Sequence, residues 1–450
     1  MLIRVMTLIF FVSVCHGCVM AESPDPWTQL SLSTCRVDEF MAAHPKTDGR
    51  GVVIAVLDTG VDPGVAGLTR TSTGEFKVVD TQDFSGQGDV PLHRVYLDPT
   101  DGKIIHHSDD GAPIHYAPPA GLGTGDAAPA LWFGTLKEVK FTNSGVPDLN
   151  DNGTTNDEFP VLVVAPPGCG DDGMWAYVDT DMDRDFADEK ALANYKLKYD
   201  TFTFPRPKPE EQIEPLTISL NIFLRERKVV FHFDDGGHGT HCAGIAAGFQ
   251  INNQPNFHGV APGAKVISLK LAQNSYGGVT TSGSKMAAFR YAARYARDHN
   301  VPVVCNLSYG IGSAREGVHE IDEAIEKLCR ENPYLIICHS AGNEGPGIST
   351  IGTPAAASSI TVAALMAADT ARDIRGDVSE TPQVATFSSR GGELAKPDVA
   401  APGFATSTVP RWVKRGDFWG GTSMSSPYVA GLCALLVSDA MQRDPNAKVR

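Results

Sequence analysis

Strand-like and helix-like segments alternate along much of this chain, and the alternation limits the folds open to it. The strand-like runs, rich in β-branched residues, occupy residues 51–57, 229–233, 265–271, 301–307, 334–339 and 360–364, and the helix-like stretches occupy 238–248, 284–298 and 318–330. Strands that alternate with helices fold as a parallel sheet with helices on both faces. The sequence therefore predicts an α/β fold of three layers with a mostly parallel central sheet.

The alternation stops between residues 85 and 228. This stretch is rich in Pro, Asp and Gly and has short, scattered apolar runs, which indicate a β-rich insertion. Its length of about 145 residues is enough for a small domain. We expect the second part of the chain to be incomplete, because one apolar helix is all that follows residue 423. The predicted parts are a signal peptide at 1–21, a first part of the α/β domain at 22–84, the insertion at 85–228 and a second part at 229–450.

Charge and cysteine content disfavour several classes of partner and site. The 450 residues include 38 Lys and Arg against 53 Asp and Glu, a net charge of -15. This charge repels nucleic-acid phosphates and anionic membrane surfaces. The nine cysteines include Cys15 and Cys18 near the N-terminus, and the remaining odd number shows no paired metal spacing. We therefore expect no disulfide framework.

The N-terminus resembles a targeting segment. An apolar run at 5–14 follows Arg4 and is too short to span a bilayer, which needs about 20 residues. The small residues at 19–21 offer a cleavage site, which predicts export to the periplasm or the extracellular space. Cys18 leaves a lipoprotein anchor open as an alternative, and a buried strand or helix is another. No later run is long enough for a membrane span, so we expect no transmembrane segment.

Three reactive side chains lie beside glycines where a strand-like run meets a helix-like one. They are Asp58, His238 and Ser423. A serine hydroxyl is a weak nucleophile until a histidine takes its proton and a carboxylate orients that histidine. A fourth motif follows the run at 334–339 and contains Asn343, whose side-chain N–H can stabilise an oxyanion together with the backbone N–H of Ser423. The four motifs together indicate nucleophilic acyl transfer.

These motifs, in the order Asp, His, Asn, Ser, resemble those of the subtilisin-like serine peptidases, the subtilases. The resemblance covers about residues 40–90 and 229–441 and extends to stretches at 258–264, 308–310, 387–391 and 396–403. It implies a seven-stranded parallel sheet and hydrolysis of protein or peptide substrates through an acyl-enzyme, with no cofactor required for the chemistry. It also implies a triad of Asp58, His238 and Ser423, with Asn343 as the oxyanion donor.

The resemblance assigns substrate-binding roles as well. The residues implied to line the primary specificity pocket are Ser308, Tyr309, Gly310, Ala341 and Gly342. We further expect an extended substrate to pair with an edge at 274–278, through Asn274 and Gly277, and with residues 308–310, in the manner of an added strand.

Within the family the chain most resembles the tripeptidyl-peptidase II-like members, because of its opening at 40–64 and the long insertion between Asp58 and His238. Those members hold a free amino terminus with two glutamates, but the matching positions here are Thr280 and Ile311. Without a carboxylate to bind the substrate's ammonium group, no contact fixes the cleavage site three residues from the amino terminus. We therefore favour an endopeptidase. The alternatives are a tripeptide-releasing exopeptidase, if Glu316, Glu344 or an insertion carboxylate substitutes, and an inactive binding module.

Two acidic loops in the insertion carry oxygen side chains at alternate positions. Such loops can wrap a hard cation, so a structural calcium ion is a candidate. A solvated acidic turn is the favoured alternative, because the glutamate that ends each loop comes one position earlier than in an EF-hand, and because Arg184 occupies the glycine turn position of the second loop. The residues concerned are Asp148, Asn150 and Asn152, followed by Glu158, and Asp179, Asp181 and Asp183, followed by Glu189.

Two further side chains near His238 are expected to be structural. His241 lacks the glutamate of a zinc-protease motif, so we interpret it as a packed core histidine and expect no zinc. Cys242 lies among Ala and Gly on the same helix-like run. Burial as a small apolar side chain is therefore preferred to a nucleophilic role.

Overall fold

The structure is a computed structural model that describes residues 30–108, 110–122, 128–170, 172–206, 215–312 and 315–444. The predicted signal peptide and the alternative lipid anchor at Cys18 lie outside the described residues. Export therefore stays a prediction.

An eight-stranded sheet forms the centre of the fold, in the order β16-β15-β14-β13-β1-β12-β2 with β17 beside β15. Seven strands run parallel and β16 is antiparallel, which confirms the predicted α/β architecture. The strands are β1 (Val53–Asp58), β2 (Val78–Asp83), β12 (Lys265–Lys270), β13 (Val303–Leu307), β14 (Leu335–Ser340), β15 (Ile360–Met366), β16 (Gln383–Val384) and β17 (Val399–Pro402).

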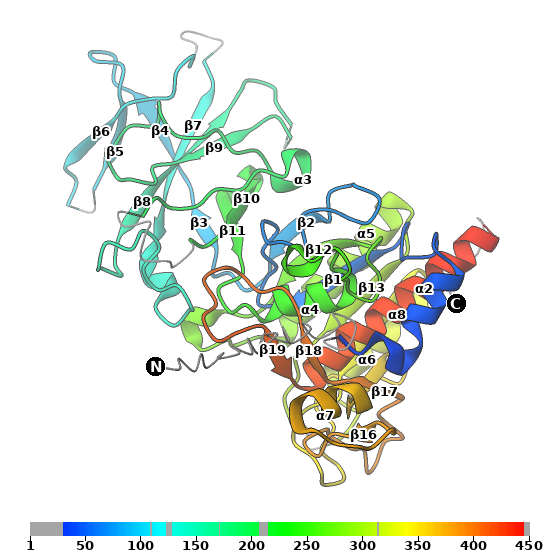
Figure 1. The fold of residues 1–450 in the computed structure, drawn as a ribbon. Helices are drawn as coiled ribbons and strands as arrows, with labels where there is room; N and C mark the ends of the chain where they lie inside the picture. Colours follow the sequence, from blue (N-terminus) through cyan, green and yellow to red (C-terminus); the bar gives the residue numbers. More distant parts are fainter. Residues whose placement is uncertain are drawn as a thin grey trace, which may run out of the picture.

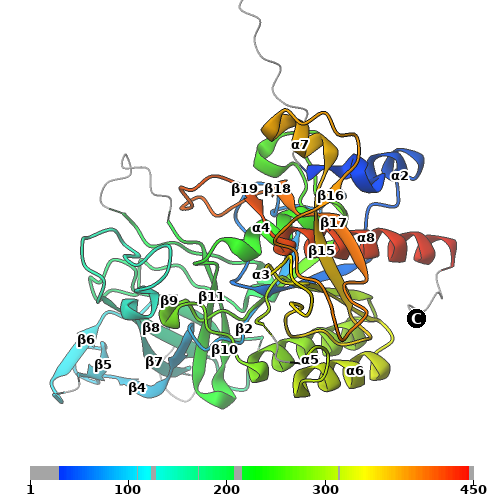
Figure 2. The same cartoon turned by 90° about the horizontal axis from the view of Figure 1, so that it is seen from below.

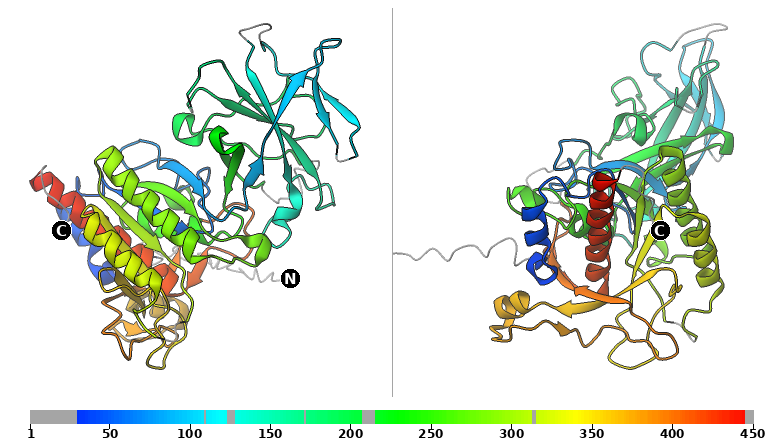
Figure 3. Two further views of the ribbon diagram at one scale, coloured as in Figure 1. Left: turned by 180° about the vertical axis from the view of Figure 1, so that it is seen from behind. Right: turned by 90° about the vertical axis from the view of Figure 1, so that its right-hand side faces the viewer.

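Helices cover both faces of this sheet, as the views in Figures 2 and 3 show. One face packs against α4 (His238–Ala247) and α8 (Thr422–Arg443), and the other against α5 (Ser282–His299) and α6 (Glu320–Glu331). The central strand β1 serves both cores, because Ile54 and Val56 point to one side and Val53, Ala55 and Leu57 to the other. Alternate side chains of a strand face opposite ways, so a strand buried on both faces must be apolar throughout.

The insertion forms an antiparallel sheet to one side of the main sheet (Figure 1). Its order is β6-β5-β4-β7-β8-β9. The presence of strands agrees with the predicted β-rich character, while the boundaries at 85 and 228 stay a prediction. The strands are β4 (His93–Leu97), β5 (Ile104–His107), β6 (Pro113–Tyr116), β7 (Ala130–Lys137), β8 (Glu158–Ala165) and β9 (Trp175–Val178).

A three-stranded antiparallel sheet lies between the two larger sheets (Figure 1). It consists of β10 (Ile218–Phe223), β11 (Lys228–Phe233) and β3 (Asp89–Pro91). The run at 229–233, expected to open the second part of the α/β domain, thus pairs with strands of the insertion rather than with the main sheet. The three strands share an apolar cluster with β7, β8 and β9.

Shorter elements complete the fold. Of the described helices, α8 is the one long and apolar enough to suit a membrane span, and most of it is buried against the main sheet, as a core helix would be. The remaining elements are α2 (Val37–Ala43), α3 (Tyr195–Lys198), α7 (Ala368–Arg375), the 3₁₀ helices η1 (Leu32–Cys35), η3 (Glu138–Phe141), η5 (Leu224–Glu226), η6 (Ile251–Asn253) and η7 (Asn274–Tyr276), and the strand pair β18 (Phe404–Thr406) and β19 (Phe418–Gly420).

Candidate active site

Asp58 and His238 meet where β1 ends and α4 begins. The imidazole Nδ1 of His238 lies 2.8 Å from Asp58 Oδ1 and 3.0 Å from Asp58 Oδ2. The close approach of α4 depends on Gly239, because a Cβ there would lie 2.0 Å from the carbonyl oxygen of Gly60. Burial lowers the pKa of His238, but the neighbouring Asp58 carboxylate, together with Cys242, outweighs it and holds this pKa well above the ordinary value of 6.5. The carboxylate therefore both orients the imidazole and stabilises its charged form.

The turn that carries His238 is fixed by a second aspartate that the sequence analysis did not single out. The buried carboxylate of Asp234 accepts hydrogen bonds from Thr59 Oγ1 at 2.7 Å, Gly237 N at 2.8 Å and Thr240 N at 3.0 Å. These bonds join the loop after β1 to the start of α4. Asp234 thereby ties together the segments that carry Asp58 and His238.

Ser423 is the second residue of α8 and is bonded to Ser308 in both directions. Its Oγ donates to the carbonyl oxygen of Ser308 at 3.2 Å, and Ser308 Oγ donates to the carbonyl oxygen of Ser423 at 2.8 Å. Among the hydrogen bonds of the described residues, the Ser423 hydroxyl thus contacts Ser308 rather than His238. The serine is held at the end of β13, close to the strand end that carries Asp58.

Cys242 contacts both the histidine and the backbone of the serine. Its Sγ lies 3.8 Å from His238 Nδ1 and 3.4 Å from the carbonyl oxygen of Ser423. The side chain is buried, as predicted, and burial raises the pKa of the thiol above its ordinary value. Asp58, His238 and Cys242 could each offer one metal ligand within 4.8 Å. The hydrogen bond between Asp58 and His238 already uses two of these groups.

Asn343 lies just after β14 and faces the start of α8. Its Oδ1 accepts hydrogen bonds from the backbone N–H of Thr422 at 3.0 Å and from Thr422 Oγ1 at 2.9 Å, which fixes the orientation of the amide. A Cβ on Gly421 would lie 3.6 Å from both Asn343 Nδ2 and Ser423 N. The two donors therefore converge on a small space that is open because residue 421 has no side chain.

A cleft of about 280 Å³ is lined by Asp58, His238 and Ser308, and it brings several of the predicted substrate-binding residues together. Of the other predicted pocket residues, Ala341 is buried and Gly342, with a φ of +109°, donates its N–H to Thr422 Oγ1 at 3.3 Å. Gly310 precedes Ile311, which exchanges backbone hydrogen bonds with Thr353. The residues that line the cleft include Asp58, His238, Leu271, Asn274, Gly277, Gly278, Thr280, Ser308 and Tyr309.

The segment at 274–278, with which an extended substrate is predicted to pair, is a short helix and a turn rather than a strand, and the pairing itself stays a prediction. Residues Asn274–Tyr276 form the 3₁₀ helix η7, and Gly277 and Gly278 follow with φ values of +73° and +80°. Two successive glycines in the left-handed region make a tight turn, closed by a bridge between Gln273 and Val279. The turn borders the cleft but does not offer a strand edge along its length.

A buried ion pair holds this turn in place, and the sequence analysis missed it. Lys270 Nζ lies 2.8 Å from Asp235 Oδ1, and both side chains are fully buried. Lys270 also donates to the carbonyl oxygen of Thr59 at 2.8 Å, beside Asp58. Asn274 Nδ2 donates to Asp235 Oδ1 at 2.6 Å. The pair thus connects the loop after β1, the loop before α4 and the turn at the cleft.

The insertion reaches the same carboxylate. Gln87 Nε2 donates to Asp235 Oδ2 at 2.7 Å, and Gln87 Oε1 accepts from the backbone N–H of Asn274 at 3.0 Å. The backbone N–H of Gly145 donates to the carbonyl oxygen of Asp235 at 2.9 Å. Asn143 Nδ2 donates to the carbonyl oxygen of Ser275 at 2.8 Å. The insertion is therefore bonded directly to the segments that border the cleft.

The carboxylates considered as replacements for the amino-terminal anchor differ in availability. Glu316 is buried, and one of its oxygens accepts the backbone N–H groups of Gly392, Glu393 and Leu394 at 2.9–3.0 Å. Glu344 is exposed, and its Oε2 accepts from Ser389 Oγ at 3.0 Å. Glu316 is consequently a structural anchor for a loop, whereas Glu344 keeps a solvent-facing carboxylate.

His241 is a packed core histidine, as predicted. Its ring stacks on Trp419 with centroids 4.3 Å apart, and its Nε2 donates to the carbonyl oxygen of Asp417 at 2.9 Å. Burial lowers its pKa to about 3, so the ring is neutral. Thus His241 is held as a structural side chain rather than as a partner in the reaction.

Both predicted cation loops lie in the insertion. The first, Asp148, Asn150 and Asn152, is closed by hydrogen bonds within the loop, and the second brings Asp179, Asp181 and Asp183 together. Calcium binding there stays a prediction at this point.

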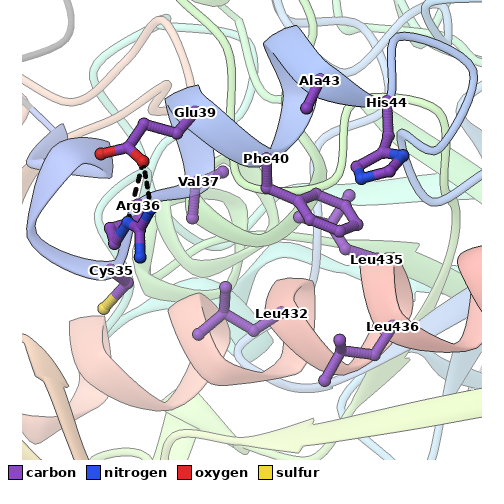
Figure 4. A pocket seen from close by; sticks show the side chains of 10 residues that line it. All are labelled: Cys35, Arg36, Val37, Glu39, Phe40, Ala43, His44, Leu432, Leu435 and Leu436. Carbon is purple, nitrogen blue, oxygen red and sulfur yellow. Dashed lines mark hydrogen bonds and ion pairs between the residues drawn. The ribbon is translucent and has the colours of Figure 1, made fainter.

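A larger cavity, about 530 Å³, lies elsewhere, between α2 and the C-terminal half of α8 (Figure 4). Phe40, Leu432 and Leu436 give it an apolar lining, and the charged pair of Arg36 and Glu39 lies at its edge. The residues that line it include no serine. The smaller cleft is therefore the candidate active site.

Comparison with known proteins agrees with this geometry. Residues 49–450 match the subtilase family, Peptidase S8. Pyrolysin from Pyrococcus furiosus is 32% identical over 87% of this chain and 31% of its own length, and tripeptidyl-peptidase 2 from Oryza sativa subsp. japonica is 30% identical over 89% of this chain and 33% of its own length. The chain thus spans about a third of the length of these curated relatives.

A solved structure shows the same fold. The crystal structure of tripeptidyl peptidase 2 (TPP II) matches 90% of this chain and 34% of that chain, with a TM-score of 0.66 and 22% sequence identity. The resemblance predicted from the four motifs is confirmed. The chain belongs to the subtilase family and is a serine-type peptidase.

Proposed function

We propose that this peptidase is an exported endopeptidase that cleaves proteins by acyl transfer, with Asp58, His238 and Ser423 as its triad. The observation that carries the proposal is the hydrogen bond between Asp58 and His238 Nδ1. Because Nδ1 is engaged, the free ring nitrogen Nε2 is the one left to accept the proton of a serine hydroxyl.

In the reaction Ser423 Oγ turns from the carbonyl oxygen of Ser308 towards His238. His238 removes the hydroxyl proton as the oxygen attacks the substrate carbonyl, and then delivers it to the leaving amine. Water repeats the sequence on the acyl-enzyme. Asp58 stabilises the imidazolium that forms at each proton transfer.

The oxyanion formed by this attack would lie in the space beside Gly421. Asn343 Nδ2 and Ser423 N both face that space, and the N-terminus of α8 favours negative charge there. A side chain at residue 421 would occupy the same volume. The absence of a side chain at residue 421 therefore leaves room for the anion.

Endopeptidase action is favoured by the side chains at the positions where an amino-terminal anchor is expected. Thr280 donates to the carbonyl oxygen of Leu271 at 3.3 Å, Ile311 is apolar and 56% exposed, and Glu316 is occupied by backbone N–H groups. The second candidate is an exopeptidase that releases tripeptides, favoured by the similarity to tripeptidyl-peptidase 2 and by the exposed carboxylate of Glu344.

Matched peptides separate the two candidates. One peptide is offered with a free and with an acetylated amino terminus, and the products are identified by mass spectrometry. We expect equal cleavage of both forms at internal bonds. Cleavage restricted to the free form, with tripeptide products, would establish the exopeptidase instead.

The triad is tested by labelling with a fluorophosphonate. The parent chain should be labelled on Ser423 and should lose its turnover, while Ser423→Ala should be neither labelled nor active but should melt at the parent temperature. An unlabelled, folded parent chain would favour the inactive binding module. Export is tested separately, by locating the processed protein and sequencing its amino terminus.

A further inference from the structure

The loop that follows β9 in the insertion gathers three carboxylates. One oxygen atom from each of Asp179, Asp181 and Asp183 lies within 4.8 Å of the others. Asp181 and Asp183 are exposed, whereas Asp179 has no exposed surface. None of the ion pairs formed by the described residues includes any of the three. The loop therefore concentrates negative charge around a buried acid.

Asp179 is incompletely satisfied. Its Oδ2 accepts the backbone N–H of Arg184 at 3.1 Å, but its Oδ1 is buried without a hydrogen-bond partner among the described residues. A buried carboxylate oxygen without a partner is costly unless something else supplies positive charge.

The objection that Arg184 occupies a glycine position does not hold in the structure. Arg184 adopts a φ of +68°, so the loop makes the left-handed turn without a glycine there. Its backbone N–H then folds back onto Asp179. At the end of the loop, Glu189 Oε1 accepts from both the backbone N–H and the hydroxyl of Thr180. A fourth carboxylate is thus held against the same loop.

The other acidic loop is satisfied more fully. The two oxygens of Asp148 accept the backbone N–H groups of Asn152 at 3.2 Å and Gly153 at 2.8 Å, and the amides of Asn150 and Asn152 both donate to Asp157. Asn150 Oδ1 is buried without a partner, but it belongs to a neutral amide. The negative charge that lacks a partner is therefore concentrated in the loop after β9.

We propose that the loop at residues 179–189 binds a calcium ion, with Asp179, Asp181 and Asp183 as its side-chain ligands. Calcium accepts six to eight oxygen ligands in irregular geometry, whereas magnesium requires a near-ideal octahedron, which an irregular loop with several carboxylates does not favour. The loop also joins the sheet to a distant segment, because Ala117 N donates to the carbonyl oxygen of Arg184 at 2.9 Å and Phe186 N donates to that of Ala117 at 3.0 Å. The ion would fasten the β9 edge of the insertion to the segment after β6.

The test is calorimetric titration of calcium chloride into the full chain carrying Ser423→Ala, after treatment with a chelator. This background prevents self-cleavage and makes the result independent of the proposed peptidase mechanism. We expect binding with a dissociation constant between roughly 10 µM and 1 mM. We also expect a melting temperature that rises with calcium and responds more weakly to magnesium.

Three substitutions assign the site. Asp179→Asn should remove the binding event, and Asp183→Asn, at an exposed position where folding is not at stake, should weaken it by about tenfold or more. The matched control Asp148→Asn, in the other loop, should bind as the parent does. The proposal is overturned if the parent binds no calcium, if Asp183→Asn binds like the parent, or if Asp148→Asn alone abolishes binding.

Discussion

Asn343 contacts Thr422 through one end of its amide and is proposed to bind the oxyanion through the other, and two substitutions separate these roles. Its Oδ1 accepts two hydrogen bonds from Thr422, at 3.0 and 2.9 Å, and its Nδ2 faces the space beside Gly421. Asn343→Ala removes both ends. Asn343→Asp keeps the acceptor for Thr422 and replaces the donor with a second oxygen. The variants should therefore agree in activity and differ in stability.

The magnitudes follow from the contacts. A hydrogen bond contributes roughly 0.5–1.5 kcal/mol to stability, and Asn343 is exposed, so the loss of two bonds in Asn343→Ala should cost about 1–2 kcal/mol. In Asn343→Asp the bonds remain, and a negative charge near the N-terminus of α8 is favourable by about 0.3–1 kcal/mol. This variant should be as stable as the parent or slightly more so.

Turnover should respond differently. Loss of one oxyanion donor lowers kcat by about 10²–10³-fold, which corresponds to roughly 2.7–4 kcal/mol of transition-state stabilisation. Asn343→Ala should show this loss with KM unchanged, because the contact forms only with the developing anion. Asn343→Asp should lose at least as much, because its carboxylate repels that anion.

The assay measures kcat and KM on a chromogenic peptide, and unfolding by urea in chains that also carry Ser423→Ala. Two results would refute the reasoning. If Asn343→Asp kept the turnover of the parent, the amide donor would not serve the reaction. If both variants lost equal stability, the bonds to Thr422 would not hold the start of α8.

Three further predictions concern buried or shifted charges. Lys270→Met should cost about 3–5 kcal/mol of stability in urea unfolding, because it leaves the Asp235 carboxylate buried without its cation; a loss below 1 kcal/mol would contradict this view of the pair. Burial lowers the pKa of His238, but Asp58 raises it further. The acid limb of the kcat/KM profile should therefore have its midpoint above pH 6.5, and Asp58→Asn should move that midpoint to lower pH while lowering the rate. An unmoved midpoint would rule out this cause of the shift. Glu316→Gln should lower stability by roughly 1–3 kcal/mol, because backbone hydrogen bonds outweigh burial and lower the pKa of Glu316 below 4.5. In the parent this contribution to stability is present above pH 4.5 and is lost as pH falls through the lowered pKa of Glu316. Glu316→Gln should also leave the ratio of capped to free peptide cleavage unchanged. A changed ratio would mean that Glu316 contacts the amino terminus of the substrate.

The fold could be predicted because most strands of the main sheet appear in the sequence as short, mostly apolar runs. The runs that became β1, β12, β13, β14 and β15 are apolar on both faces, as a sheet covered on both sides requires. The reactive side chains follow directly after such runs or begin the next helix. Their convergence at one edge of the sheet follows from parallel strand direction.

The remainder depends on contacts between distant residues. The turn at 274–278 adopts its form because Gly277 and Gly278 take positive φ and Asn274 is held by Asp235, a partner 39 positions earlier. The run at 229–233 looks like the other buried strands, yet its pairing with β10 and β3 is fixed by the register of a separate sheet. No local pattern distinguishes Lys270, which is buried and paired, from an exposed lysine at the end of a strand.

The bonding of Asp235 has a practical consequence for anyone who wishes to shorten this enzyme. Excising residues 85–228 would remove the Gln87 amide and the Gly145 N–H, and with them two of the hydrogen bonds that hold the loop before α4. The trimmed protein would need a new donor for that carboxylate and a new partner for the backbone of Ser275. The insertion and the candidate active site are therefore best redesigned together.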